Sequence, residues 1–203
     1  IFSPRHRHLL AGIERADSLA WNPHKMMGVP LACSATLMRE KGRLVATNGM
    51  NADYLFHGDA EQSIDLGDMT LQCGRRVDAL KLWFSWQALG DEGFVRRIDD
   101  LFDLARSFCE LIDGRPGYQL VREPQGTNVC FRYLPPADRE TRGEERDRRA
   151  HDATLRIRER LVRDGRFLVN YATLDGLATF RLVLSNSSTT TEDLTALLEA
   201  IEE

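Results

Sequence analysis

The 203-residue sequence is poor in lysine, in cysteine and in long apolar runs, and each shortage narrows what the protein can be. No stretch approaches the roughly 18 consecutive apolar residues of a membrane-spanning helix, so we expect a soluble protein with no membrane association. The net charge of −4 gives no basic surface for nucleic acid. The four cysteines form no CxxC pair and the histidines lack metal-ligand spacing, so no metal site is predicted. This cysteine usage favours a reducing, cytoplasmic setting.

Lysine is the scarcest charged residue, because the whole chain contains only Lys25, Lys41 and Lys81. Any reaction that needs an amine therefore has three candidate groups. The chain opens directly into Ile1-Phe2, with neither an initiator methionine nor a basic-then-apolar signal segment. We therefore expect it to be part of a longer protein.

What the sequence does contain is a mixed pattern of strands and helices. In the first half, short buried strands are predicted at residues 18–21 and 32–38, short helical segments at 8–15 and 40–46, and longer helices at 77–89 and 94–112, separated at Gly90. In the second half, strands at 118–121, 128–134, 167–171 and 179–184 and a helix at 147–164 precede a C-terminal helix capped at Thr191. This half is predicted to be α+β, with antiparallel strands and helices on one face.

Residues 49–70 interrupt this pattern. They hold glycine, asparagine and aspartate throughout, show no sustained period and exceed the usual length of a connection. Such a segment is typical of a functional loop.

The sharpest chemical signal is the run Asn22-Pro23-His24-Lys25-Met26-Met27-Gly28, in which a predicted strand ends at a lysine. An amine forms an imine with an aldehyde only when it is unprotonated, so partial burial or nearby positive charge would favour the reaction by lowering its pKa. His24 could contact a bound group or move a proton near neutral pH. The residues alone leave open the alternative that Lys25 is an ordinary exposed lysine in a turn.

Residues 16–35, ADSLAWNPHKMMGVPLACSA, closely resemble the segment around the cofactor lysine of the group II pyridoxal-phosphate (PLP) dependent decarboxylases, in particular those that act on glutamate and cysteine sulfinate. Further stretches match in order: RHRHLLAGIERAD at 5–17, YLF at 54–56, LQCGRRVDALKLW at 71–83, TNVCF at 127–131 and FRLVLSN at 180–186. The resemblance covers nearly the whole chain and implies the C-terminal portion of a family member.

The resemblance implies roles for individual residues. Lys25 matches the Schiff-base lysine, His24 the histidine that precedes it, and Asn22 an asparagine that helps hold the cofactor phosphate. Gly74 falls where the family places a backbone amide near that phosphate, which suits a residue without a side chain. Tyr54 matches the tyrosine of a mobile catalytic loop that is proposed to return a proton to the substrate α-carbon after carbon dioxide leaves.

Arg181 lies in the predicted strand 179–184, where alternation alone would allow a solvent-facing arginine. In the family, the arginine of the matching FR motif binds a substrate carboxylate, a task that a planar guanidinium performs well. The resemblance therefore implies an acidic substrate, namely glutamate, cysteine sulfinate or aspartate.

The fold implied by the resemblance is the type I fold of PLP-dependent transferases, an α/β fold. Residues 1–90 would be the C-terminal part of the large cofactor domain with its mainly parallel sheet, and 91–203 the small α+β C-terminal domain. A PLP-dependent carboxy-lyase acting as a homodimer is expected, with part of its active site upstream of Ile1. Two alternatives remain: an aromatic or other amino-acid decarboxylase on the same fold, and a non-catalytic truncated fragment that binds a full subunit.

Overall fold

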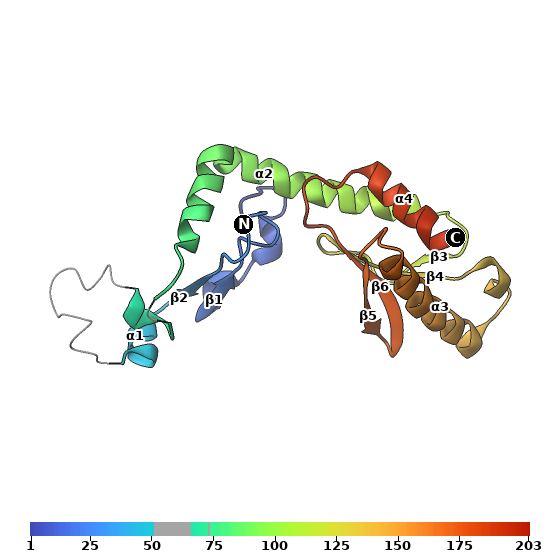
Figure 1. Ribbon diagram of the computed structural model, residues 1–203, viewed down its shortest axis with the longest axis horizontal. Helices are drawn as coiled ribbons and strands as arrows, with labels where there is room; N and C mark the ends of the chain where they lie inside the picture. The colour runs from blue at the N-terminus through green and yellow to red at the C-terminus, as the bar shows by residue number, and fades with distance from the viewer. Residues whose placement is uncertain (51–65, 73) are drawn as a thin grey trace. The chain divides into compact units, whose positions relative to one another are not determined.

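The computed structural model describes residues 1–50, 66–72 and 74–203 (Figure 1). The chain divides into two compact units, Ile1–Val95 and Arg96–Glu203, and the boundary falls inside helix α2 (Asp78–Ile112). The predicted division after residue 90 into a cofactor domain and a small domain stays a prediction. Within the ranges that are described, no helix has the length and apolar character needed to cross a membrane.

The first unit is built mainly from short elements. They are the 3-10 helices η1 (Arg7–Leu10), η2 (Ile13–Arg15) and η3 (Gly67–Met69), the strands β1 (Ser18–Trp21) and β2 (Ala35–Met38), helix α1 (Arg43–Asn48) and the first part of α2. β1 and β2 pair antiparallel, with Ser18 opposite Met38. This pair therefore differs from the mainly parallel sheet expected here. The prediction that both strands are buried is wrong, since side chains such as Leu37, at 50% exposure, remain accessible.

An aromatic cluster holds the first unit together. The ring of Phe2 lies 5.3 Å from that of Trp86 and 5.8 Å from that of Phe94, and Trp86 meets Phe94 edge to face at 5.2 Å. Contacts of this geometry add about 0.5–1.5 kcal/mol beyond the burial of the rings. Met27 and Val29 pack into the same core. Because these two residues follow Lys25 closely in the chain, the core also anchors the turn that carries Lys25.

Helix α2 contains the break that the sequence predicts. Gly90 has φ 64° and ψ 179°, a conformation that is essentially restricted to glycine, and it interrupts the helical backbone. Trp86 Nε1 donates a hydrogen bond to Asp91 Oδ1 at 2.7 Å across this break. The prediction of two helical segments separated at Gly90 is therefore confirmed.

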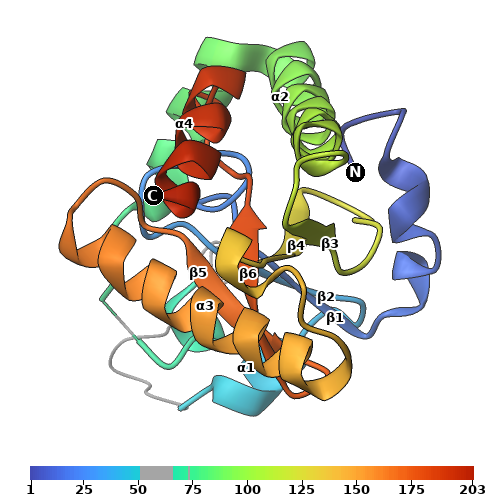
Figure 2. The same ribbon diagram turned by 90° about the vertical axis from the view of Figure 1, so that its right-hand side faces the viewer.

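The second unit is α+β, as predicted. Its sheet has the strand order β3-β4-β6-β5, and all neighbouring strands are antiparallel. The elements are β3 (Tyr118–Leu120), β4 (Asn128–Tyr133), β5 (Asn170–Leu174), β6 (Leu177–Val183), the 3-10 turn η4 (Pro136–Asp138) and the helices α3 (Gly143–Arg163) and α4 (Thr191–Glu202). Helix α3 packs against β4, β5 and β6, and Figure 2 shows it running across the sheet.

Phenylalanine rings fill the space between this sheet and its helices. Phe131 lies 5.3 Å from Phe108 of α2 and 5.3 Å from Phe180, and none of the three is exposed. Phe131 and Phe180 are cross-strand partners on the core face. Because side chains alternate along a strand, Arg181 lies on the opposite face of the sheet.

The N-terminal cap of α4 differs by one residue from the prediction. Thr190, rather than Thr191, is the capping residue, because its Oγ1 accepts a hydrogen bond from Asp193 N at 3.2 Å. The Asp193 carboxylate accepts in return from Thr190 N at 2.9 Å. This reciprocal pair satisfies two N–H groups that the helix cannot satisfy itself.

Candidate active site

Lys25 lies in a tight turn directly after β1, and backbone hydrogen bonds fix that turn. Lys25 N donates to the Asn22 carbonyl at 3.0 Å, and Gly28 N donates to the Lys25 carbonyl at 2.9 Å. Gly28 has φ 70°, a left-handed conformation that glycine adopts without steric cost. Met27 is buried in the core, whereas Lys25 is exposed. The turn therefore holds its backbone in place while it exposes the lysine side chain.

Two polar side chains of this turn contact the segment that precedes β2. His24 Nδ1 lies 2.6 Å from the Cys33 carbonyl oxygen, and Ser34 Oγ donates to Asn22 Oδ1 at 2.8 Å. Ser34 Oγ also lies 3.3 Å from His24 Nδ1. The structure thus brings together three of the predicted site residues, Asn22, His24 and Lys25, and adds Ser34 to them.

The three lysines differ in their surroundings. Lys81 Nζ forms an ion pair with Asp78 at 2.8 Å and donates to the Ala32 carbonyl at 2.6 Å. The hydrogen bond from Lys81 holds the pKa of the Asp78 carboxyl below its ordinary value. An ammonium held between two acceptors is unsuited to attack an aldehyde. Lys41 is exposed in the turn before α1, so Lys25 is the lysine with the site residues beside it.

Gly74 is exposed in the first unit, and a Cβ added there would meet no described atom within 4 Å. Its backbone also lies outside the left-handed region that favours glycine. The described part of the chain therefore does not itself require glycine here. A requirement would come from a group bound to the protein, and the contact of the Gly74 amide with a phosphate stays a prediction.

Two other predictions concern Tyr54 and metals. Tyr54 lies outside the residues that the structure describes, as does most of the predicted loop at 49–70, so its role stays a prediction. Among the residues that are described, no group of three or more His, Cys, Asp and Glu side chains is placed to hold a metal ion.

Arg181 is exposed on β6, in the second unit. Its cross-strand neighbours are Cys130 on β4 and Asn170 on β5. On the same face, Arg132 Nε donates to Thr179 Oγ1 at 3.1 Å, so that arginine is tied to the sheet. The guanidinium of Arg181 forms no hydrogen bond or ion pair within the described part of the chain. Its fork of N–H donors is therefore available for a carboxylate.

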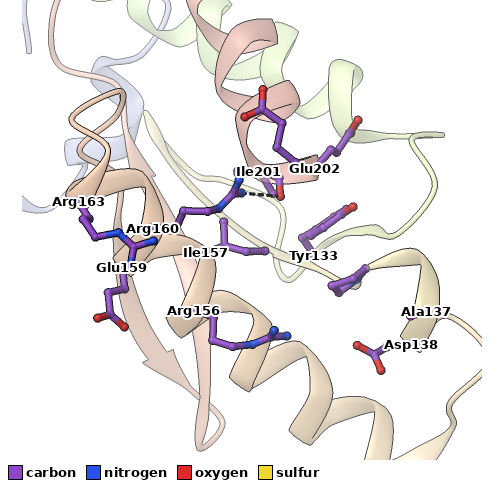
Figure 3. A pocket seen from close by; sticks show the side chains of 12 residues that line it. Tyr133, Ala137, Asp138, Arg156, Ile157, Glu159, Arg160, Arg163, Ile201 and Glu202 are labelled. Carbon is purple, nitrogen blue, oxygen red and sulfur yellow. Dashed lines mark hydrogen bonds between the residues drawn. The ribbon is translucent and has the colours of Figure 1, made fainter.

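A cleft of about 560 Å³ lies elsewhere in the second unit, between α3, the end of α4 and the segment after β4 (Figure 3). Its lining carries both signs of charge, including Arg156 and Glu159. Arg160 Nη2 donates to the Ala200 carbonyl at 2.6 Å, which stabilises the C-terminal end of α4. None of the predicted site residues lines this cleft. We interpret it as a gap in the packing between α3 and α4 and not as a ligand site.

The sequence of the chain matches a known family over most of its length. Residues 1–134 match the pyridoxal-dependent decarboxylase conserved domain, and the chain therefore belongs to this family. The family predicted from the turn motif is confirmed.

Individual relatives narrow the comparison. The chain is 42% identical over 210 residues to human cysteine sulfinic acid decarboxylase and 42% identical over 207 residues to the mouse protein of that name. Both alignments include 100% of this chain and 42% of the relative, so the chain spans less than half the length of these relatives.

Solved structures give the same result for the fold. A crystal structure of mouse CSAD matches with a TM-score of 0.90 and 40% identity, over 99% of this chain and 42% of that one. Oryza sativa TDC with PLP and tryptamine matches with a TM-score of 0.85 and 29% identity, over 98% of this chain and 40% of that one. The predicted α/β type I fold is confirmed.

Sequence reasoning missed Ser34 as a member of the site, and it missed the contact that Lys81 makes with the segment before β2. Both are polar residues inside apolar stretches, which is a signal that a side chain has a specific partner. Their partners, Asn22 and Ala32, lie 12 and 49 residues away along the chain. Local patterns do not reveal contacts over such separations.

Proposed function

We propose that the full-length protein containing this chain decarboxylates an acidic L-amino acid, namely glutamate, cysteine sulfinate or aspartate, with PLP held as a Schiff base on Lys25. One observation carries the proposal. The turn after β1 exposes a lysine beside an asparagine and a histidine whose side chains are fixed by hydrogen bonds. Membership of the decarboxylase family and 42% identity to cysteine sulfinic acid decarboxylases support the same reaction.

The groups of this turn fit pyridoxal phosphate. Lys25 provides an amine for the aldehyde, Asn22 provides amide N–H donors suited to a phosphate, and His24 provides a ring that can contact the cofactor. The backbone amide of Gly74 would be a further phosphate donor. When bound, the cofactor supplies an electron sink for the electron pair that remains when the α-carboxylate leaves as carbon dioxide.

Arg181 supports an acidic substrate. Its exposed guanidinium would bind the second acidic group of the substrate, and its planar fork suits two parallel hydrogen bonds. Tyr54, which lies outside the described residues, is the residue that would return a proton to the α-carbon. The resemblance also supports a cytoplasmic homodimer.

A second candidate is the decarboxylation of an aromatic amino acid. The likeness to Oryza sativa TDC with PLP and tryptamine favours it, although the identity of 29% is below the 40% shared with mouse CSAD. In a pocket for an aromatic side chain, the charge of Arg181 would lose its partner at a cost in free energy. The remaining alternative is a non-catalytic fragment that binds a full subunit, so the experiments below use the full-length protein.

Borohydride reduction of the PLP-loaded full-length protein, followed by proteolysis and mass spectrometry, should locate a pyridoxyl group on Lys25. Lys25→Ala should lose the visible imine absorbance and reduce turnover by about a thousandfold or more, since the attachment of the cofactor is lost. Lys41→Ala removes an exposed lysine and should retain both properties. A pyridoxyl group on another lysine would contradict the assignment of Lys25.

The substrate is tested by turnover of the same protein on glutamate, cysteine sulfinate, aspartate and tryptophan. We expect one of the three acidic amino acids to have the highest kcat/KM. A preference for tryptophan would support the second candidate instead.

A further inference from the structure

Ser34 contacts both polar side chains that precede Lys25 in the turn. Its Oγ lies 2.8 Å from Asn22 Oδ1 and 3.3 Å from His24 Nδ1. The residue is exposed at the end of the segment that runs into β2. One hydroxyl group therefore joins Asn22 to His24.

The contacts of His24 indicate where its ring carries a proton. Nδ1 lies 2.6 Å from the Cys33 carbonyl oxygen, which can only accept a hydrogen bond. Two lone pairs at this distance would repel, so Nδ1 carries the proton. The Cys33 amide nitrogen also lies 3.2 Å from Nδ1, but a protonated nitrogen cannot accept, and the shorter contact decides. In the neutral ring the lone pair is then on Nε2.

This tautomer sets the direction of the hydroxyl group of Ser34. Because Nδ1 of His24 carries a proton that is donated to the Cys33 carbonyl, it cannot accept the hydroxyl proton of Ser34, which is therefore directed to the other partner, Asn22 Oδ1. The Asn22 side-chain oxygen is thereby occupied as an acceptor. Its amide nitrogen, which carries two N–H donors, is the end that remains for a ligand.

An asparagine can present either end of its amide, and the two ends differ in what they bind. The N–H end attracts an anion such as a phosphate, whereas the oxygen end repels it. The contact with Ser34 favours the orientation that suits an anion. The residue that this contact orients, Asn22, lies three positions before Lys25, at the site of the proposed cofactor.

We propose that Ser34 is a positioning residue for the cofactor. Its hydroxyl holds Asn22 with the amide N–H groups toward the cofactor phosphate, and the Nδ1-protonated ring of His24 sets the direction of that hydroxyl. The inference rests on the proposed function, in which Lys25 carries PLP. It assigns Ser34 a part in binding the phosphate group and none in the chemical step.

The test compares PLP with pyridoxal, which lacks the phosphate, in the full-length apoprotein. Ser34→Ala should weaken PLP binding about tenfold, the equivalent of losing roughly 1.4 kcal/mol. Its affinity for pyridoxal should change less than twofold. Ser34→Thr retains the hydroxyl and should bind PLP like the wild type. Thr36→Ala, which removes an exposed hydroxyl from β2, is the matched control.

A double mutant tests the connection through Asn22. If Ser34 acts by orienting Asn22, then Ser34→Ala should add little to the loss of PLP affinity already caused by Asn22→Ala. The melting temperature of each apoprotein is measured alongside, and we expect that of Ser34→Ala to stay within about two degrees of the wild type.

Two results would overturn the inference. One is unchanged PLP affinity in Ser34→Ala; the other is an equal loss of affinity for PLP and pyridoxal together with a lower melting temperature, which a merely structural role would give. Failure of the proposed function is distinguishable from either, because the wild type itself would then form no reducible adduct at Lys25. That outcome would remove the basis of the inference as well.

Discussion

The proposed preference for an acidic substrate depends on one exposed side chain, that of Arg181. If it binds an acidic group in the closed site, Arg181→Ala should cost about 2–5 kcal/mol in kcat/KM on the acidic substrates, as loss of one partner of a desolvated charged pair does. Arg181→Lys should also be poor, because an ammonium lacks the two-pronged geometry. The melting temperature should change little, since the residue is exposed and packs no core.

A suitable control is Arg122→Ala. Arg122 is an exposed arginine of the same unit whose ion pair with Asp175, at 3.4 Å, lies on the surface. Such pairs contribute about 0–1 kcal/mol, so neither kinetics nor stability should change appreciably. Normal kcat/KM in Arg181→Ala would contradict the acidic-substrate proposal.

Gly74 offers a second test at the scale of one residue. Because an added Cβ meets no described atom within 4 Å, Gly74→Ala should leave the fold intact or stabilise it by about 0.4–1 kcal/mol through the unfolded state. If its backbone amide approaches the phosphate closely, the same substitution should raise the Kd for PLP. Fluorescence titration of the apoprotein measures this, with Gly126→Ala, also unobstructed, as the control. Unchanged Kd would remove Gly74 from the site.

At the scale of secondary-structure elements, Tyr118 ties the edge strand β3 to helix α4. Its hydroxyl donates to the Leu198 carbonyl at 3.0 Å. Tyr118→Phe should therefore lower the free energy of unfolding by about 0.5–1.5 kcal/mol. Urea unfolding of the full-length protein at neutral pH measures this, and Tyr171→Phe, at a tyrosine that is 40% exposed on β5, should have a smaller effect.

The same tyrosine predicts a pH dependence. Burial raises the pKa of Tyr118 well above its usual range, and the nearby Glu202 adds to this. In the unfolded chain the phenol ionises at about pH 10, whereas in the folded protein it stays protonated at that pH. The stabilisation is therefore complete below pH 10 and is lost progressively as the pH rises above it. Between pH 9 and pH 10.5, the urea midpoint of unfolding should decrease more for the wild type than for Tyr118→Phe. An equal decrease in the two proteins would contradict this.

The hairpin of β5 and β6 shows why the predicted bounds of two strands differ from those in the structure. The strands were predicted at 167–171 and 179–184 but lie at Asn170–Leu174 and Leu177–Val183. Asp175 and Gly176 join them with φ 53° and 79°, the left-handed pair of a two-residue hairpin turn. Asp-Gly is a known signal for this turn, and using it would have set the register.

At the scale of the whole molecule, the first part of α2 and the residue before it leave apolar side chains accessible. Val77 is 73% exposed, Trp83 53% and Phe84 58%. Clustered apolar surface of this kind is usually covered in the working protein. We expect the rest of the full-length protein and, in the homodimer that the family resemblance implies, a second copy to share in covering this surface.

Light scattering of the full-length protein at micromolar concentration should therefore give twice the mass of one chain. Trp83→Ser should shift the mass toward that of the monomer, because it removes a large apolar contact from the interface. Leu168→Ser, at an 84% exposed position of the second unit, is the control. A monomeric wild type would contradict the homodimer, and a dimeric Trp83→Ser would place the interface elsewhere.

Local sequence determined the parts of this protein that depend on neighbours along the chain. The helix pattern around Gly90, the α+β character of the second half and the lysine turn after β1 were all readable, because periodicity and turn chemistry act over a few residues. The dense motif around Lys25 was also sufficient to identify the family.

Tertiary structure decided the contacts that join residues far apart in sequence. It showed that Ser34 holds Asn22, that Lys81 donates to the Ala32 carbonyl, and that Arg181 lies on the face of the sheet opposite the phenylalanine core. A residue's own neighbours in sequence do not specify such partners, since they depend on which segments pack together once the core forms. The composition of the site around the lysine is therefore a property of the fold.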